Sequence, residues 1–228
     1  MRHLRPSLVA LALSLTALSF TALTFSPLTS HADASLWHEN FVQFPADWGS
    51  PRQNASEIRA VYRVASEGGD HFLHADHDGT SKIPAVHVGR AFRSPELPLR
   101  SACRLSWKWR VLEHPKVGED AWLDLGASVY VVTKNPGLFG SGRGFKFGWL
   151  SKPGARGKDQ RGIRQLELRH SPATRQFETE SVDLCALYEQ HFGPVGDEKL
   201  LYVGVVSDAD NTKSRARADY ADFRLTAH

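Results

Sequence analysis

Short apolar runs, each bounded by turn residues, follow one another through most of this chain. The clearest run is Leu105–Val111, where a leucine, two tryptophans and a valine alternate with polar residues, so one face of a strand is apolar. Ala127–Thr133 is a continuous run rich in β-branched residues, which is typical of a strand buried on both faces. A chain made of such strands has to bury their apolar faces against another layer.

Similar patterns predict further strands along the chain. They cover residues 41–44, 58–64, 72–75, 85–92, 144–150, 163–169, 177–181, 200–207 and 218–225. One segment differs: Asp183 can cap a helix over about residues 183–192, and Gly193-Pro194 ends it. Many strands, one short helix and no alternating strand–helix units predict an all-β fold, a two-sheet β-sandwich or jelly roll.

The first 34 residues have the features of a secretory signal peptide. Two arginines precede the uncharged run Leu8–Phe25, and Ala32-Asp33-Ala34 matches the small-residue pattern that signal peptidases cleave. We expect residues 1–34 to be removed and residues 35–228 to form a single periplasmic or secreted domain. The alternative is a retained membrane anchor, because the apolar run is about long enough to span a bilayer. We expect no transmembrane segment after cleavage.

Charge and cysteine content narrow the choice of partners. After residue 34 the chain keeps 26 basic and 24 acidic residues, a net charge of +2. This weak charge gives no long-range attraction to a polyanion, so nucleic acid is not an expected partner. Cys103 and Cys185 are either bridged or two buried thiols, because a sequence does not give the Cα spacing that a disulfide requires.

The candidate ligand-binding residues concentrate between Arg143 and Arg164. Seven basic and three aromatic residues lie within these 22 positions, against one acidic residue. Aromatic faces can stack on sugars, and cations attract anionic groups in a salt-sensitive way. The candidates are Trp149, Arg143, Lys146, Arg156 and Lys158, with Trp122 and Asp124 from a nearby segment. The alternative is a charged loop that is merely solvated.

The tryptophans fall into two groups. Trp107 and Trp109 share an apolar strand face, so we expect them in the core and not in a sugar-stacking platform. The others lie in or near expected loops and are better candidates for exposure. They are Trp37, Trp48, Trp122 and Trp149.

An acidic segment follows the strand expected at 200–207. Asp208, Asp210 and Asn211 provide oxygen ligands of the kind that Ca²⁺ prefers. The glycine and closing glutamate of an EF-hand loop are missing, which favours a turn whose side chains bind the local backbone. Calcium bound by these residues is the alternative to that turn, and Asp219 and Asp222 on the last strand are candidate additional ligands.

Other motifs point weakly to chemistry. The histidine-rich segment 70–78 allows a transition-metal site, but a solvated edge strand followed by a turn explains it as well. Glu178 and Glu180 share one face of a polar strand, and adjacent carboxylates in such a place are usually solvated. The chain has no Gly-x-Ser-x-Gly motif. We therefore assign no catalytic residue, and a non-enzymatic role is favoured.

Several motifs together resemble an exported bacterial family catalogued as domain of unknown function 3047. They are Trp107-x-Trp109-x-Val111, Tyr130-Val131-Val132, residues 204–212 and residues 218–223. The resemblance covers about residues 41–225 and implies an exported β-sandwich, but no activity. The family usually has an Asp-Asp pair and an arginine before the Tyr-Val-Val strand. This chain has Leu123-Asp124 and Ser128 there, so one carboxylate is kept and the arginine is absent.

These observations lead to one leading interpretation and two alternatives. The leading one is an exported β-sandwich that binds a glycan or another component of the cell envelope. The first alternative is a polysaccharide hydrolase or lyase in which Asp124, Asp208 or Asp210 supply the carboxylates. The second is a structural envelope protein that packs against another protein.

Overall fold

The computed structural model describes residues 35–80, 84–93, 96–118, 120–135, 142–153 and 159–227. The expected signal peptide lies outside these ranges. None of the helices within them is long and apolar enough to cross a membrane.

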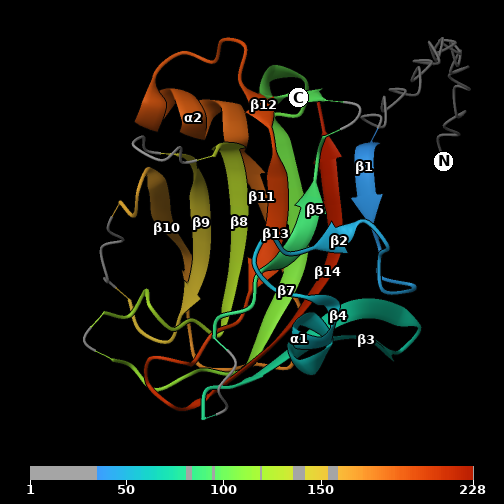
Figure 1. Cartoon of the computed structure of the whole chain (residues 1–228), viewed down its shortest axis with the longest axis vertical. Coiled ribbons are helices and arrows are strands. Elements are labelled where there is room, and N and C mark those ends of the chain that lie inside the picture. Colours follow the sequence, from blue (N-terminus) through green and yellow to red (C-terminus); the bar gives the residue numbers. More distant parts are fainter. Residues whose placement is uncertain are drawn as a thin grey trace, which may run out of the picture. The chain divides into compact units, whose positions relative to one another are not determined.

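Two six-stranded sheets form the body of the protein (Figure 1). Sheet A contains β1 (Ser35–Glu39), β3 (Tyr62–Glu67), β4 (Asp70–Asp78), β7 (Arg104–Glu113), β11 (Glu178–Asp183) and β14 (Arg215–Thr226). Its order is β11-β7-β14-β4-β3, and β1 also pairs with β14. All of these pairs are antiparallel.

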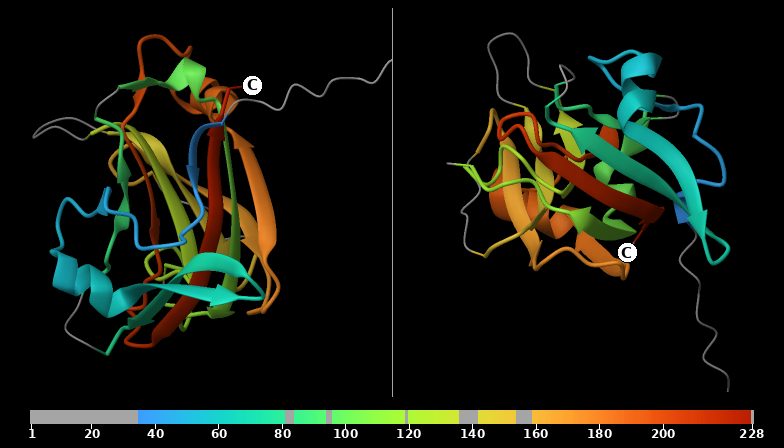
Figure 2. Two further views of the ribbon diagram at one scale, coloured as in Figure 1. Left: turned by 90° about the vertical axis from the view of Figure 1, so that its right-hand side faces the viewer. Right: turned by 90° about the horizontal axis from the view of Figure 1, so that it is seen from below.

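Sheet B lies against sheet A as a second layer (Figure 2). It contains β2 (Trp48–Gly49), β5 (Val88–Ala91), β8 (Ala127–Lys134), β9 (Arg143–Leu150), β10 (Ile163–His170) and β13 (Tyr202–Val206). Its order is β10-β9-β8-β13-β5-β2, and only the β9–β10 pair is parallel among the described strands. A short pair, β6 (Leu97–Pro98) with β12 (Lys199–Leu200), and a 3₁₀ turn at Leu99–Ser101 complete the strands and turns. The predicted two-sheet β-sandwich is confirmed.

The core between the sheets is rich in aromatic residues. Trp107 and Trp109 on β7 are fully buried, which confirms their predicted place in the core. Trp107 contacts Phe147 of β9 with ring centroids 5.7 Å apart, and Trp109 contacts Trp149 at 5.5 Å. Large rings from facing sheets therefore hold the two layers together.

The expectation that the other four tryptophans are exposed is wrong. The exposed fractions are 6% for Trp37, 5% for Trp48, and 1% each for Trp122 and Trp149. Trp37, Trp48 and Trp149 lie on strands β1, β2 and β9 with their rings turned inward. Trp122 packs in a small separate cluster with Leu125 and Leu150. Each ring removes a large apolar area from water when it is buried. This burial is favourable even where the tryptophan lies close to an expected loop.

Residues 58–64 do not form the single predicted strand. Helix α1 (Ala55–Val61) comes first, and β3 begins only at Tyr62. The Asn54 side chain accepts hydrogen bonds from the backbone N–H groups of Ser56 and Glu57, and the Glu57 carboxylate accepts one from Asn54 N. This capping box was visible in the sequence as Asn-x-x-Glu, and it explains why the period-two pattern was misleading.

The strand expected at residues 41–44 is also absent. The N-terminal strand is β1, Ser35–Glu39, and Phe41 after it has a φ of 54°. A left-handed residue turns the chain and interrupts extended structure. The Phe41 ring is nevertheless fully buried, since the turn directs it into the core.

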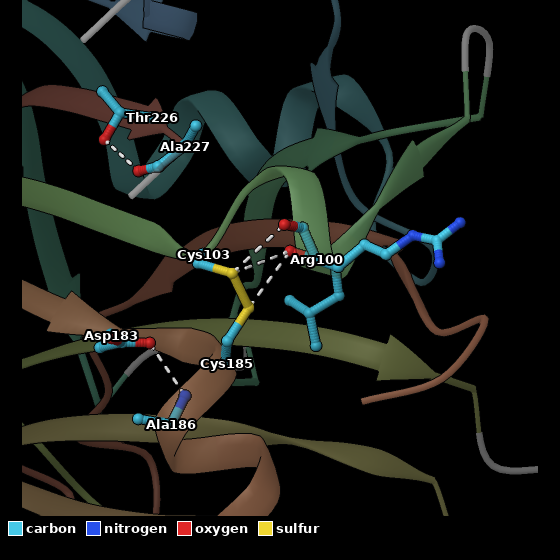
Figure 3. Close-up of a disulfide and its surroundings, with 8 residues drawn as sticks. Arg100, Cys103, Asp183, Cys185, Ala186, Thr226 and Ala227 are labelled. Carbon is cyan, nitrogen blue, oxygen red and sulfur yellow. Dashed lines mark hydrogen bonds between the residues drawn. A yellow bond between two sulfur atoms is a disulfide. The ribbon is translucent and has the colours of Figure 1, made fainter. Parts of the chain in front are cut away.

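The predicted helix is confirmed as α2 (Leu184–Phe192). Asp183 caps it by accepting a hydrogen bond from Ala186 N at 2.9 Å, and Gly193 with φ 94° ends it. Cys103 and Cys185 form a disulfide with a Cα–Cα distance of 5.0 Å, which decides between the two cysteine interpretations (Figure 3). The bridge ties the start of β7 to the first turn of α2.

The histidine-rich segment forms β4, which is an interior strand and not a solvated edge strand. It lies between β14 and β3, and His74 and His77 are buried. His74 Nδ1 donates to Asp219 Oδ1 at 2.6 Å, and Arg110 Nε donates to Asp219 Oδ2 at 2.6 Å. Asp219 therefore binds within sheet A and does not join Asp208 as a metal ligand.

Candidate functional site

The structure brings six of the sequence-predicted residues together at one end of the sandwich. This end is drawn at the bottom of Figure 1, where the connection from β7 to β8 meets the connection from β13 to β14. The six residues are Trp122, Asp124, Lys146, Asp208, Asp210 and Asn211. We call Asp124, Asp208 and Asp210 the carboxylate cluster, because one oxygen from each lies within 4.8 Å of the others.

Asp124 joins the two connections. Its Oδ1 accepts hydrogen bonds from Asn211 N (3.2 Å) and Nδ2 (2.8 Å), and its Oδ2 accepts from Thr212 N (2.7 Å) and Oγ1 (2.6 Å). Burial alone would raise the pKa of Asp124, but the hydrogen bonds from Thr212 and Asn211 outweigh it and lower the pKa. This side chain is therefore ionised at neutral pH.

Asp208 and Asp210 form the polar turn that the sequence predicts. Asp208 Oδ1 accepts from the backbone N–H of Asp210 at 3.1 Å, and Asp210 Oδ2 accepts from Ala85 N at 3.2 Å. Burial, followed by the neighbouring carboxylates of Asp210 and Asp124, raises the pKa of Asp208 to about 6. One carboxyl in the cluster thus holds its proton far more tightly than Asp124 does.

Lys146 places a cation beside the carboxylate cluster. It lies on β9, is buried, and its Nζ donates to the Trp122 carbonyl oxygen at 2.7 Å. Burial lowers the pKa of Lys146 to about 8, although the charges of Asp208, Asp120 and Asp124 act in the opposite direction. Lys146 was expected to be an exposed ligand-binding cation, so its buried position is a correction.

Sequence reasoning missed the polar groups that surround Lys146 on the outer face of sheet B. Lys146 pairs in register with Tyr130, and its Nζ lies 5.6 Å from the centroid of that ring. His87 packs edge-on against Tyr130 at 5.0 Å, and burial lowers the pKa of His87 to about 4. Tyr202 lies over Gly204, where an added Cβ would come within 2.3 Å of the tyrosine oxygen. The alternation of side chains along each strand indicates which residues share this face. Only the order of the strands in the folded sheet shows which of these residues are neighbours.

A pocket of about 230 Å³ opens beside Asp124. Its apolar wall comes from Pro115, Val117, Ala121, Leu125, Leu150 and Pro153. Its polar groups come from His114, Lys116, Asp124, Ser151 and Lys152. His114 Nε2 donates to the Ser171 carbonyl oxygen at 2.9 Å, and burial lowers the pKa of His114. His114 is therefore neutral at pH 7, with Nδ1 as an acceptor, and the two exposed lysines supply the positive charge of the pocket.

The remaining candidates lie elsewhere. Arg143 is near α2 at the other end of β9, where it donates to Tyr188 Oη and to Glu198 Oε1. Trp149 is in the core, with Nε1 donating to Ser171 Oγ at 3.0 Å. Arg156 and Lys158 lie outside the described residues. The described part of segment 143–164 therefore does not form one basic surface.

Asp222 also lies away from the carboxylate cluster. Its carboxylate accepts hydrogen bonds from His38 Nε2 at 2.7 Å and Arg224 Nε at 2.9 Å on the outer face of sheet A. Of the candidate metal ligands, Asp208, Asp210 and Asn211 lie together with the added Asp124, but the Asn211 amide nitrogen donates to Asp124 and Asp210. Carboxylate oxygens are ligands that Ca²⁺ accepts, although four hydrogen bonds already engage Asp124.

Comparisons with known proteins add little beyond these observations. No family model matches the chain, and no curated protein matches it. The resemblance to the family of unknown function therefore stays a prediction.

Several solved structures are similar over most of their length. The K1 cleaved adhesin domain of Lys-gingipain from Porphyromonas gingivalis W83 is 17% identical, with 84% of this chain and 98% of that chain covered and a TM-score of 0.41. Endoglucanase cel12A from Rhodothermus marinus is 14% identical, with 72% and 84% covered and a TM-score of 0.42. Endoglucanase 3 from Trichoderma harzianum, of family GH12, is 11% identical, with 72% and 82% covered and a TM-score of 0.39. Similarity at this level carries no argument about function.

Proposed function

We propose that this protein is an exported β-sandwich that binds an acidic saccharide in the pocket beside Asp124. The observation that carries the proposal is the composition of the pocket wall: an apolar surface with Lys116 and Lys152 at its edge. Apolar surface suits the C–H face of a sugar ring, and the two ammonium groups suit a carboxylate or sulfate. The neutral His114 offers an acceptor for a sugar hydroxyl.

Electrostatics favour an acidic ligand over a neutral one. Both carboxylate oxygens of Asp124 are held by donors from Asn211 and Thr212. Among the described residues, no ion pair engages Lys116 or Lys152. Both lysines are exposed, and binding of an anion to exposed cations weakens as salt rises.

The test is a calorimetric titration with trigalacturonate, with neutral galactotriose as the matched sugar. We expect trigalacturonate to bind more tightly, with an affinity that falls with added salt. Changing both Lys116→Gln and Lys152→Gln should weaken it by about a hundredfold or more, because each charged hydrogen bond contributes roughly 1.5–3 kcal/mol and the double change removes two of them. Lys134→Gln, at an exposed lysine at the end of β8, is the control and should change nothing. Equal effects of the two sets of variants would remove the pocket from the proposal.

A second candidate function rests on the divergent pKa values in the carboxylate cluster. Asp208 has a pKa raised to about 6, whereas the pKa of Asp124 is lowered, and such a pair can supply a general acid and a fixed negative charge. This supports the alternative of a polysaccharide hydrolase or lyase. Release of new reducing ends from polygalacturonate, lost in Asp208→Asn and kept in Asp197→Asn, would support it. No release by the parent protein would leave binding as the function.

Export to an oxidising compartment is part of the same proposal. The Cys103–Cys185 bridge supports it, since such bridges persist mainly outside the cytoplasm. N-terminal sequencing of the protein from its host should begin at Ser35. A sequence beginning at Met1 in a membrane pellet would instead favour the retained anchor.

A further inference from the structure

A second cavity lies on the outer face of sheet A, away from the pocket beside Asp124. Its volume is about 350 Å³, and it shares no lining residue with that pocket. It lies where β1 and β4 succeed each other along one edge of β14. Tyr220 is the last residue of β14 paired with β4, and Phe223 is the first paired with β1. We call this cavity the β14 notch.

Asp222 lies in the gap between these pairings. It is in the left-handed region with φ 53°, and the register of β14 against β7 shifts between Ala221 and Arg224. A bulge re-aims a side chain, and a non-glycine residue held in this region persists because the surrounding structure enforces it. The bulge directs the Asp222 carboxylate to the notch, where Ala221 and Asp222 are both part of the lining.

The charges in the notch compensate one another. Asp222 accepts from His38 Nε2 and Arg224 Nε, and Lys108 Nζ lies 3.4 Å from its other oxygen. These hydrogen bonds outweigh burial and lower the pKa of Asp222, so it is ionised at neutral pH. Asp70 is a second carboxylate of the lining, against the cations Lys108 and Arg224. Fixed donors and acceptors without a surplus of either charge suit a neutral ligand with many hydroxyl groups.

Phe177 adds an aromatic surface to the notch. Its ring is held by the Arg110 guanidinium, 4.4 Å from the ring centroid, and by Phe72, whose centroid is 5.7 Å away. Arg110 is itself fixed by Asp219 and Glu67. A ring fixed in this way loses little conformational freedom when a ligand packs against it.

We propose that the β14 notch is a binding site for a neutral sugar unit, with Asp222 and Arg224 binding its hydroxyl groups and Phe177 contacting its ring. This site is independent of the acidic saccharide proposed for the pocket beside Asp124. The combination of a carboxylate, a guanidinium and an aromatic ring offers acceptors, donors and an apolar face within one cavity. Vicinal hydroxyls can donate to a carboxylate and accept from a guanidinium at the same time.

The test uses the full mature chain and three neutral trisaccharides: cellotriose, maltotriose and galactotriose. We expect at least one to bind, with an affinity that changes little with salt. Asp222→Asn and Arg224→Gln should each weaken that binding by about tenfold, since each removes a charged hydrogen-bond partner. Asn also tolerates the left-handed region, so Asp222→Asn keeps the backbone of the bulge.

Matched controls come from the same face of sheet A. Asp76→Asn removes a carboxylate that pairs with Arg215, and Arg104→Gln removes an exposed arginine on β7; neither residue lines the notch. Both controls should bind the trisaccharide as the parent does. The proposal is overturned if none of the three sugars binds at about 10 mM, a concentration well above the dissociation constants of specific protein sites. Equal losses in the variants and their controls would overturn it as well. Every variant should still bind trigalacturonate. The pocket beside Asp124 is then intact, and a loss of trisaccharide binding is assigned to the β14 notch.

Discussion

Asp124 and Asp208 belong to one cluster, yet their surroundings move their pKa values in opposite directions. Donors from Asn211 and Thr212 lower the pKa of Asp124, whereas burial and like charge raise that of Asp208 to about 6. The folded state therefore binds a proton at Asp208 in a pH range where the unfolded chain, with a pKa near 3.8, releases it. Stability contributed by this proton is present at low pH and is lost as pH rises through about 4 to 6.

Asp208→Asn should remove this dependence on pH. Compared with the parent, the variant should gain stability as pH rises from about 4 to about 7, by roughly 1–3 kcal/mol in the free energy of unfolding. Urea denaturation at several pH values measures the difference. Asp197→Asn, at an exposed position, is the control. A constant offset between variant and parent at all pH values would show that Asp208 titrates normally.

The same cluster predicts a response to calcium. Three carboxylate oxygens within 4.8 Å of one another can share a divalent cation, and binding to the folded state alone raises the melting temperature. The rise with about 5 mM calcium should be larger at about pH 7.5 than at about pH 5, because protonated Asp208 is a poor calcium ligand. Asp210→Asn should abolish it. Identical melting curves with calcium and with a chelator would leave the polar turn as the whole role of this segment.

At the scale of residues, the sequence indicated which side chains could bind a ligand. It did not indicate which of them lie close together in the fold. It singled out Asp208, Asp210 and Asn211 because they are adjacent in the chain. It selected Asp124 separately, and nothing in the sequence indicated that Asn211 and Thr212, almost ninety residues later, donate to it. Lys146 was chosen as an exposed cation, although on β9 it is buried and donates to the Trp122 carbonyl oxygen.

At the scale of elements, the disulfide joins parts that are distant in sequence. Cys103 and Cys185 are 82 residues apart, and the bridge fixes α2 against the start of β7. In the chain-entropy description, closing a loop of this length restricts the unfolded state by about 4–5 kcal/mol. The double change Cys103→Ala with Cys185→Ala should therefore lower stability by about 2–5 kcal/mol, the range for native disulfides.

Denaturation with and without a reducing agent checks this prediction. The parent protein should lose stability when reduced, and the alanine variant should be insensitive to the reductant. Equal stability of the oxidised parent and the variant would contradict the account, since it would mean that the bridge restricts nothing in the unfolded chain.

The strands were predictable where side-chain pattern alone decides. Val129 and Val131 alternate onto the core face of β8, which lies inside sheet B, and the β-branched run anticipates a buried strand. The segment 58–64 failed because the Asn54–Glu57 capping box, a local signal, outweighs its period-two pattern. The place of β4 in the interior of sheet A was not predictable, since its polar residues are buried by partners such as Asp219 that tertiary structure brings to them.

At the scale of the whole molecule, the protein is a β-sandwich with polar sites on different surfaces. The aromatic core between the sheets leaves the outer faces and the connecting segments free for ligands. The pocket beside Asp124 is cationic at its edge, whereas the β14 notch is balanced in charge. The sequence predicted the sandwich and a carboxylate site, but the tryptophans that it offered as sugar-stacking surfaces are structural.

The most direct test of the proposed function is an NMR titration of the ¹⁵N-labelled mature protein with trigalacturonate. Binding in the pocket beside Asp124 should shift the backbone amide signals of Lys116, Leu125 and Ser151, which line it. Galactotriose should leave these signals in place, and added salt should reverse the shifts because the attraction depends on exposed cations. Shifts confined to other surfaces, or equal shifts with the neutral sugar, would contradict the proposal that this pocket binds an acidic saccharide.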